Sequence, residues 1–180
     1  MAEQLIGKGF VAGVVGGLVG TAVLDGLQEA SVEGTRRAEE SAGGLGRWTK
    51  PYTKQQERQI KVYEHAHSET ADWVVGKVGV KGLSTRQRKA AAPIVHYLFG
   101  ALCGGVYGAL AELAPVATAG FGTVFGLTLF AGASEGVLPA IGLIPGPTET
   151  PVPVQVGGAV THVVYGATTE GVRRLVRSLL

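Results

Sequence analysis

The sequence predicts an all-α protein, a bundle of four transmembrane helices, and three features of its composition lead to this fold class. Only 17% of its 180 residues are charged, against about 25% in typical soluble domains. Glycine is unusually frequent, with 29 residues. Twelve of the 16 Lys and Arg residues lie between residues 28 and 90, whereas residues 90–172 contain neither. Long uncharged runs bordered by charge are typical of membrane proteins.

Several runs reach the roughly 20 mainly apolar residues that a bilayer-spanning helix needs. These four predicted spans cover residues 5–26, 91–113, 115–143 and 154–172. The first run lacks a basic flank and a small-residue cleavage site, so we interpret it as a retained span rather than a signal peptide. The chain then divides into helix 1 (1–28), a polar basic loop (29–89) and helices 2–4 with a basic C-terminus (90–180).

The basic loop has two parts of different character. Residues 31–48 carry mixed charge and a glycine pair, which is typical of a flexible segment. Residues 54–78 place Tyr63, His67 and Trp73 near helical spacing, which predicts an amphipathic helix at the membrane interface.

Small residues recur at four-residue spacing in every predicted span. Lipid tails do not drive helices together, so close backbone approach must do so, and glycine permits it. The glycines expected to pack helix against helix are Gly13, Gly17, Gly100, Gly104, Gly108, Gly122, Gly126 and Gly166.

A short motif occurs twice. The pattern His-x-x-aromatic-Gly-Ala is found at residues 96–101 and again at 162–167. The spans that precede these two each end in an acid followed by glycine, at Asp25 and at Glu135, with spacing that differs by one residue. A duplicated two-helix unit is one interpretation, and chance similarity among Gly- and Ala-rich helices is the other.

Among the ionisable residues of the predicted spans, four attract attention as a possible cluster, namely His96, His162, Glu135 and Asp25. With a rise of 1.5 Å per residue, both histidines and Glu135 would lie roughly 8–10 Å below the face that carries the long loop. Each shares a helical face with small residues, so we expect the four to face other helices as an intramembrane polar cluster. Ionisable groups in a membrane are costly and mark functional sites by default.

Four interpretations of this cluster stay open. The groups could join helices by hydrogen bonds alone, worth about 0.6 kcal/mol each. They could relay protons or ions, because histidine titrates near physiological pH. His96 and His162 could ligate haem b, or both histidines with Glu135 could hold a metal ion. We predict neither a cofactor nor a metal, and the haem and metal interpretations are alternatives.

No catalytic motif occurs in the sequence. There is no nucleophile elbow, phosphate-binding loop, His-Glu-x-x-His or dinucleotide fingerprint. The one cysteine, Cys103, lies in an apolar run, where a packing role is expected. We therefore expect a protein that is not an enzyme.

The second and fourth predicted spans resemble a known family. Residues 90–178 are similar to the YagU-like small bacterial inner-membrane proteins, a family of unknown function, and Gly142-Leu143-Ile144-Pro145 is similar to that family's Gly-Leu-x-Pro loop. The resemblance implies a multi-pass protein of the bacterial cytoplasmic membrane with its C-terminus in the cytoplasm. The motif residues that carry it, besides the two histidines, are Phe99, Tyr107, Glu112, Pro115, Glu170, Arg173 and Arg174.

These observations favour a small membrane accessory or interaction protein, a non-catalytic subunit or scaffold. The alternatives are a proton- or ion-linked transport element that uses the polar cluster, and a haem- or quinone-associated subunit of a redox complex. The expected partners are the lipid bilayer and either another membrane protein or a second copy of the chain, and no nucleic acid. Charge counting places the long loop in the cytoplasm, whereas the resemblance places the C-terminus there, so the two indications of orientation disagree.

Overall fold

A computed structural model describes residues 2–41, 66–79 and 84–180 of the chain. The described residues form helices and no strand, which confirms the predicted all-α class. The elements are α1 (Ala2–Ser41), α3 (Ala66–Lys77), α4 (Thr85–Leu113), η2 (Pro115–Gly122), α5 (Thr123–Leu129), η3 (Phe130–Val137), α6 (Leu138–Ala140) and α7 (Val152–Leu179).

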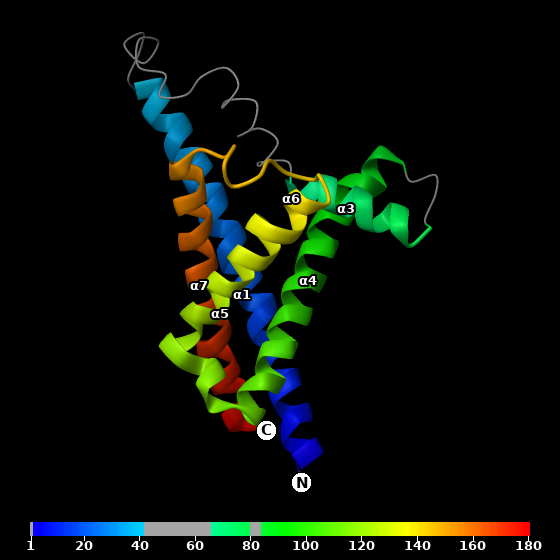
Figure 1. Cartoon of the computed structure of the whole chain (residues 1–180), viewed down its shortest axis with the longest axis vertical. Coiled ribbons are helices and arrows are strands. Elements are labelled where there is room, and N and C mark those ends of the chain that lie inside the picture. The colour runs from blue at the N-terminus through cyan, green and yellow to red at the C-terminus, as the bar shows by residue number, and fades with distance from the viewer. Residues whose placement is uncertain (1, 42–65, 80–83) are drawn as a thin grey trace.

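The long elements run side by side along the molecule in alternating directions (Figure 1). α1 packs against both α4 and α7, and α5 packs against α7, whereas α4 and α7 touch each other at few points. Both chain termini lie at one end of the bundle, which we call the terminal end (Figure 1). α3 lies across the opposite end and packs on α4.

Three helical segments among the described residues are long and apolar enough to cross a membrane: Glu3–Ala30, Ala90–Leu113 and Pro115–Ala140. They match the first three predicted spans. The predicted fourth span coincides with α7, which is long enough but is not among these three. Gln155 and His162, followed by charged residues from Glu170 onward, lower the hydropathy of α7.

The third segment is not the continuous helix that the sequence predicted over 115–143. It begins as a 3₁₀ helix, η2, and its backbone turns left-handed at Gly120, Phe121 and Gly122 before α5 starts. It then passes through a π-helix, η3, before the short α6. Glycine adopts positive φ without steric cost, so the two glycines allow this sharp corner directly after α4.

The predicted amphipathic helix over 54–78 is described only in its second half, as α3. Ala71 is buried and Trp73 is partly exposed, and the Lys77 ammonium lies 5.5 Å from the centre of the Trp73 ring. Residues 54–65 lie outside the described residues. α1 continues to Ser41, beyond the predicted boundary at residue 28, and α4 begins at Thr85.

α4 starts early because its N-terminus is capped. The Ser84 side chain accepts a hydrogen bond from the Gln87 backbone, and the Gln87 side chain accepts one from the Ser84 backbone. This reciprocal arrangement satisfies two amide groups that would otherwise lack partners at the start of the helix.

Glycines lie where α1 crosses α4. A Cβ added to Gly13 would overlap the carbonyl oxygen of Gly104, and one added to Gly108 would overlap that of Gly9. The two backbones are thus in direct contact at these positions, with no side chain between them. A larger residue at any of them would force the helices apart.

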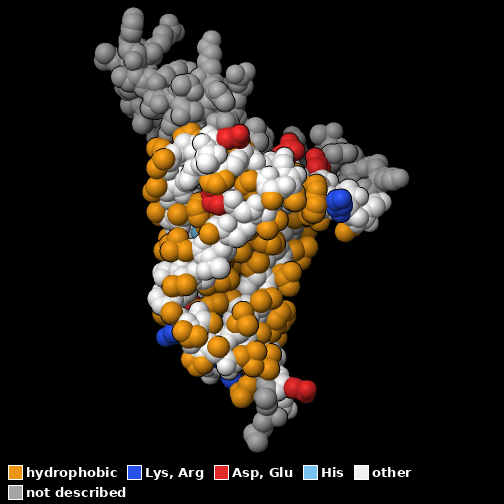
Figure 2. Space-filling model, viewed as in Figure 1, with side chains coloured by type: hydrophobic (Ala, Val, Ile, Leu, Met, Phe, Trp, Pro, Cys, Tyr) orange, Lys and Arg blue, Asp and Glu red, His pale blue; other side chains and the backbone are white. Residues whose placement is uncertain are grey.

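Most large apolar side chains of the bundle lie on its outside. On α4 they form a continuous exposed row at four-residue spacing, and Figure 2 shows apolar side chains spread over the visible face. A water-soluble bundle would bury such a row, because exposed apolar surface is costly in water. We call this row, which consists of Ile94, Leu98, Leu102, Val106 and Leu110, the α4 ridge.

Candidate functional site

The most deeply buried charge in the described part of the chain is the Glu170 carboxylate on α7, whose residue is 0% exposed. Its Oε2 accepts hydrogen bonds from the Tyr107 hydroxyl at 2.8 Å and from Arg173 Nε at 2.7 Å. Its Oε1 accepts from Arg173 Nη2 at 3.0 Å and from Arg174 Nε at 2.6 Å. Both oxygens are therefore fully engaged, as a buried carboxylate requires.

A second carboxylate, Glu112 at the end of α4, joins the same network. Arg177 donates to it twice, from Nε at 2.8 Å and from Nη2 at 3.3 Å. Arg173 Nη1 lies 3.7 Å from Glu112 Oε1, so Arg173 bridges the two carboxylates. Glu112 also lies against α1, because a Cβ added to Gly9 would be 3.2 Å from its Cδ. We call the six residues Tyr107, Glu112, Glu170, Arg173, Arg174 and Arg177 the charged cluster.

Local sequence and helix direction build this cluster. Glu170, Arg173 and Arg174 are spaced i, i+3 and i+4, which places them on one face of α7. α4 runs antiparallel to α1 and ends at the same end of the bundle as α7, so Glu112 and Tyr107 reach the last turns of α7.

Aromatic rings cover the inner side of the cluster. Tyr107 stacks on Phe125 with ring centroids 4.3 Å apart, and Phe125 contacts Tyr165 at 5.9 Å. The Tyr165 hydroxyl donates to the Gly100 carbonyl at 2.8 Å, which ties α7 to α4 again. These rings separate the charges from the apolar middle of the bundle, where the low dielectric strengthens ion pairs and makes unpaired charges costly.

The residues of the predicted intramembrane polar cluster make different kinds of contact in the structure. His96 Nδ1 lies 3.1 Å from Asp25 Oδ1, so these two residues do meet across α4 and α1, and both side chains are partly exposed. His162 Nδ1 lies 2.8 Å from the Gly158 carbonyl in its own helix, and its ring packs against Phe130 at 5.3 Å. The histidines are thus held by different kinds of contact.

Glu135 lies within the π-helix η3. Its Oε1 is buried and has no hydrogen-bond partner among the described residues. π-helical turns are rare and occur often at functional sites. In the same described part of the chain, no group of three or more His, Cys, Asp or Glu residues is arranged to hold a metal ion.

In both halves of the chain, a glycine of one segment lies against the backbone of the motif glycine on the next long helix, which favours the duplicated two-helix unit. A Cβ added to Gly17 would overlap the carbonyl oxygen of Gly100 and lie 3.2 Å from the Cα of Gly104. A Cβ added to Gly122 would overlap the carbonyl oxygen of Gly166 and lie 2.9 Å from the Cβ of Glu170. Gly100 and Gly166 hold the same place in the repeated motif.

This correspondence changes which residues are equivalent. Eight residues after Gly17 is Asp25, which contacts His96, and eight residues after Gly122 is Phe130, which contacts His162. The contacts therefore match Asp25 with Phe130. The sequence comparison had instead matched Asp25 with Glu135. An apolar ring occupies the place of the acid in the second pair.

Five of the six cluster residues, all except Arg177, were among the motif residues of the family resemblance, which assigned no role to them. A physical signal was present: an acid with two arginines one turn later on the last helix, and another acid at the end of an antiparallel helix. The other motif residues, Phe99 and Pro115, lie outside the cluster, with Phe99 exposed on α4 and Pro115 at the start of η2.

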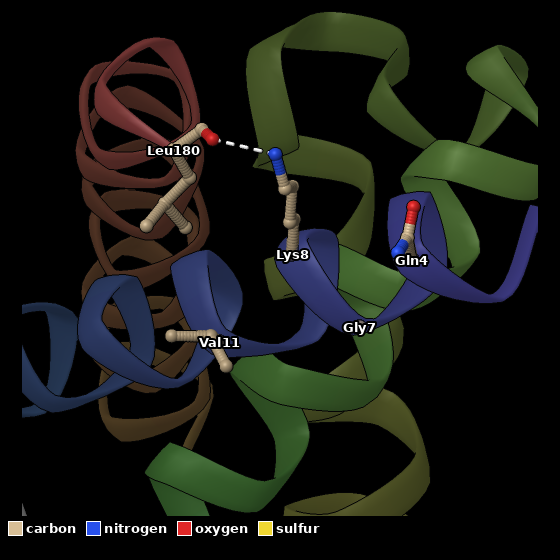
Figure 3. A pocket seen from close by; sticks show the side chains of 5 residues that line it. All are labelled: Gln4, Gly7, Lys8, Val11 and Leu180. Atoms are coloured by element: carbon tan, nitrogen blue, oxygen red, sulfur yellow. Dashed lines mark hydrogen bonds between the residues drawn. The ribbon is translucent and has the colours of Figure 1, made fainter. Parts of the chain in front are cut away.

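An open pocket lies near the cluster, at the terminal end, and is lined by Gln4, Gly7, Lys8, Val11 and Leu180 (Figure 3). The Lys8 ammonium donates to an oxygen of Leu180 at 2.6 Å. Because the one ammonium in this pocket is already engaged, we place the candidate site at the charged cluster instead.

Comparison with known proteins identifies a family for part of the chain. Residues 80–171, just over half of the chain, match the family model described as a protein of unknown function, DUF1440. The matched segment contains Tyr107, Glu112 and Glu170. No curated protein and no solved structure matches the chain. The chain therefore belongs to the DUF1440 family, whose function is unknown.

Proposed function

We propose that this chain is a small integral protein of the bacterial cytoplasmic membrane that acts as a non-catalytic subunit or scaffold. The observation that carries the proposal is the separation of side chains: large apolar residues cover the outside of the bundle, and acids and bases pair with each other inside its terminal end. Lipid favours this arrangement, since charges in a membrane must be paired internally. The resemblance to YagU-like proteins supports the choice of membrane.

In this proposal α7 is a fourth span. Its 28 residues reach about 42 Å, which exceeds the roughly 30 Å of a bilayer core. Three of its polar residues, Thr169, Glu170 and Arg173, are buried within the bundle rather than turned outward. A helix whose polar groups are satisfied by its neighbours can reside in lipid despite modest hydropathy.

Glycine contacts would hold the four spans together. In a bilayer the helices gain little from hydrophobic association, so van der Waals contact between backbones must hold them together. The contact of α1 with α4 at Gly13 and Gly104, and of α5 with α7 at Gly126 and Gly166, supports this arrangement.

The accessory role follows from how the ionisable groups are used. Every carboxylate oxygen of the charged cluster accepts bonds from arginine, so the cluster acts as a clamp between α4 and α7 rather than as a reactive centre. The α4 ridge, which faces away from the bundle, is the surface on which a membrane partner or a second copy would pack.

Purification in a mild detergent tests this role. We expect a stoichiometric membrane-protein partner or a dimer by size-exclusion chromatography with mass spectrometry. The double variant Leu98→Ser/Leu102→Ser on the α4 ridge should disrupt this complex or dimer. The double variant Val156→Ser/Val160→Ser, at exposed positions of α7, should leave it intact. A monomer without partner would contradict the accessory role, and a monodisperse chain in buffer without surfactant would contradict the membrane location.

A proton- or ion-linked transport element is the second candidate, favoured by Glu135. A buried carboxylate oxygen without a partner, in a π-helical turn of a segment that can span a membrane, is costly unless it serves a function. The nearby end of the bundle also carries the His96–Asp25 pair, whose imidazole can take up a proton.

Proteoliposomes with a pH-sensitive dye test this candidate. We expect Glu135→Gln to abolish proton flux, because the amide cannot exchange a proton. Glu149→Gln, which changes an exposed acid in the loop before α7, should leave the flux at the wild-type level. Equal flux in wild type, Glu135→Gln and protein-free vesicles would eliminate the transport function.

A further inference from the structure

We propose that Arg174 binds the phosphate group of an anionic phospholipid at the terminal end of the bundle. This inference rests on the membrane location proposed above and adds a specific lipid site to it. It starts from the charge balance of the cluster, in which three guanidinium groups face two carboxylates and one positive charge remains unmatched.

The unmatched charge is located on Arg174. Arg173 and Arg177 each donate from Nε and from an Nη group to carboxylate oxygens, and their side chains are mostly buried. Arg174 donates only from Nε, and its side chain is 54% exposed. Among the described residues, neither of its Nη groups makes a hydrogen bond. The two Nη groups of Arg174 thus remain as donors for a ligand outside the bundle.

Two neighbours hold this guanidinium in place. Glu170 binds its Nε, and the Phe121 ring lies beneath it with the guanidinium carbon 4.9 Å from the ring centre. The charge of Glu170 is itself paired with Arg173, and Tyr107 donates a hydrogen bond to it, so Glu170 does not repel an approaching anion as a lone carboxylate would. A planar guanidinium fixed in this manner matches the two oxygens of a phosphate and loses little freedom on binding.

The backbone at Phe121 supports a built site. Phe121 has φ 54° and is the one non-glycine residue with positive φ in the part of the chain that the structure describes. Such a conformation costs about 1–3 kcal/mol and persists where the surroundings enforce it. Here it directs the ring toward α7, where it lies beside Gly171: a Cβ added at Gly171 would be in ordinary van der Waals contact with the ring, at 3.7 Å.

The depth of the site favours a lipid over a free phosphate. Phe121 lies on the corner just after α4, whose apolar segment ends at Leu113, so Arg174 lies at the boundary of the proposed membrane. Exposed apolar side chains also occur at the end of α4, at the start of η2 and next to Arg174 on α7, namely Leu113, Val116 and Leu175. Figure 2 shows basic side chains at the rim of the apolar surface toward this end. Acyl chains would cover the apolar side chains while the phosphate meets Arg174.

Native mass spectrometry of the full chain in mild detergent, titrated with phosphatidylglycerol or phosphatidylcholine, tests the proposal. We expect tighter binding of phosphatidylglycerol and a loss of about tenfold, or roughly 1.4 kcal/mol, in Arg174→Gln. Arg86→Gln removes the same charge from an exposed arginine at the opposite end and should not change the affinity. Phe121→Leu should weaken binding about threefold, because the charge remains but the ring that orients it is lost.

Each contrary result has a distinct meaning. An equal loss of phosphatidylglycerol affinity in Arg174→Gln and Arg86→Gln would mean that the lipid is attracted by overall charge, and it would overturn the proposed site. Displacement of phosphatidylglycerol by millimolar inorganic phosphate would assign the site to a free anion and overturn the lipid. Unchanged affinity in Arg174→Gln, with the chain still requiring detergent, would refute this site alone, whereas a chain soluble without surfactant would refute the proposed function as well.

Discussion

Glu170→Gln is expected to destabilise the bundle by about 3 kcal/mol or more, the effect of removing one partner from a buried ion pair. Arg173, at 7% exposed, would keep its charge and lose its main acceptor. Only the 3.7 Å contact with Glu112 would still compensate it. Thermal unfolding in mild detergent, followed by circular dichroism, should show a midpoint lowered by roughly 10 °C.

Two variants separate this effect from a general loss of charge. Glu149→Gln removes an exposed acid and should unfold at the wild-type temperature. Glu170→Gln/Arg173→Gln removes both members of the pair and should regain much of the lost stability, since no uncompensated buried charge remains at residue 173. If Glu170→Gln were as stable as the wild type, the charged cluster would not clamp α4 to α7.

Gly17→Leu is expected to separate α1 from α4 and to cost about 3 kcal/mol, at the upper end of the effect of overpacking. Even a Cβ at this position would overlap the Gly100 carbonyl oxygen and approach the Gly104 Cα to 3.2 Å. Backbone atoms cannot move aside as the tip of a side chain can. The same unfolding measurement, together with the elution volume on size exclusion, reports the loss of packing.

Gly26→Leu is the matched control, because it makes the same change in the same helix. No atom lies within 4 Å of a Cβ added to Gly26, which is exposed. Leucine is the better helix former by up to about 1 kcal/mol, so this variant should be at least as stable as the wild type. Equal destabilisation by both variants would mean that glycine serves helix conformation here and not helix packing.

The paired histidine shows how far a pattern along one helix can predict a contact. His96 shares a helical face with Gly100, and Asp25 shares one with Gly17, so both groups were expected to face a neighbouring helix. They do meet, at 3.1 Å. This contact is consistent with the regular geometry of α1 and α4, in which residue spacing alone determines the shared face.

The same reasoning expected His162 to face the other polar groups, and in the structure its ring packs against Phe130. Its helix packs on a segment that begins with a left-handed corner and contains a π-helix, and neither feature appears in the spacing of apolar residues. The helix register is set by the contact of Gly122 with Gly166, which brings Phe130 to the histidine and leaves Glu135 further along. A difference of about one helical turn thus changed the neighbour from an acid to an aromatic ring.

By itself, the sequence predicted a helical chain with four spans, and the helical class and the first three of these segments are confirmed, because composition and spacing are local properties. Only the tertiary structure decided that Glu170 is buried among arginines. Along the chain, Arg173, Arg174 and Arg177 have the spacing of charges that meet water at the end of a span. The burial of Glu170 and Arg173 depends on where α4 ends beside α7, and packing between distant segments sets that position.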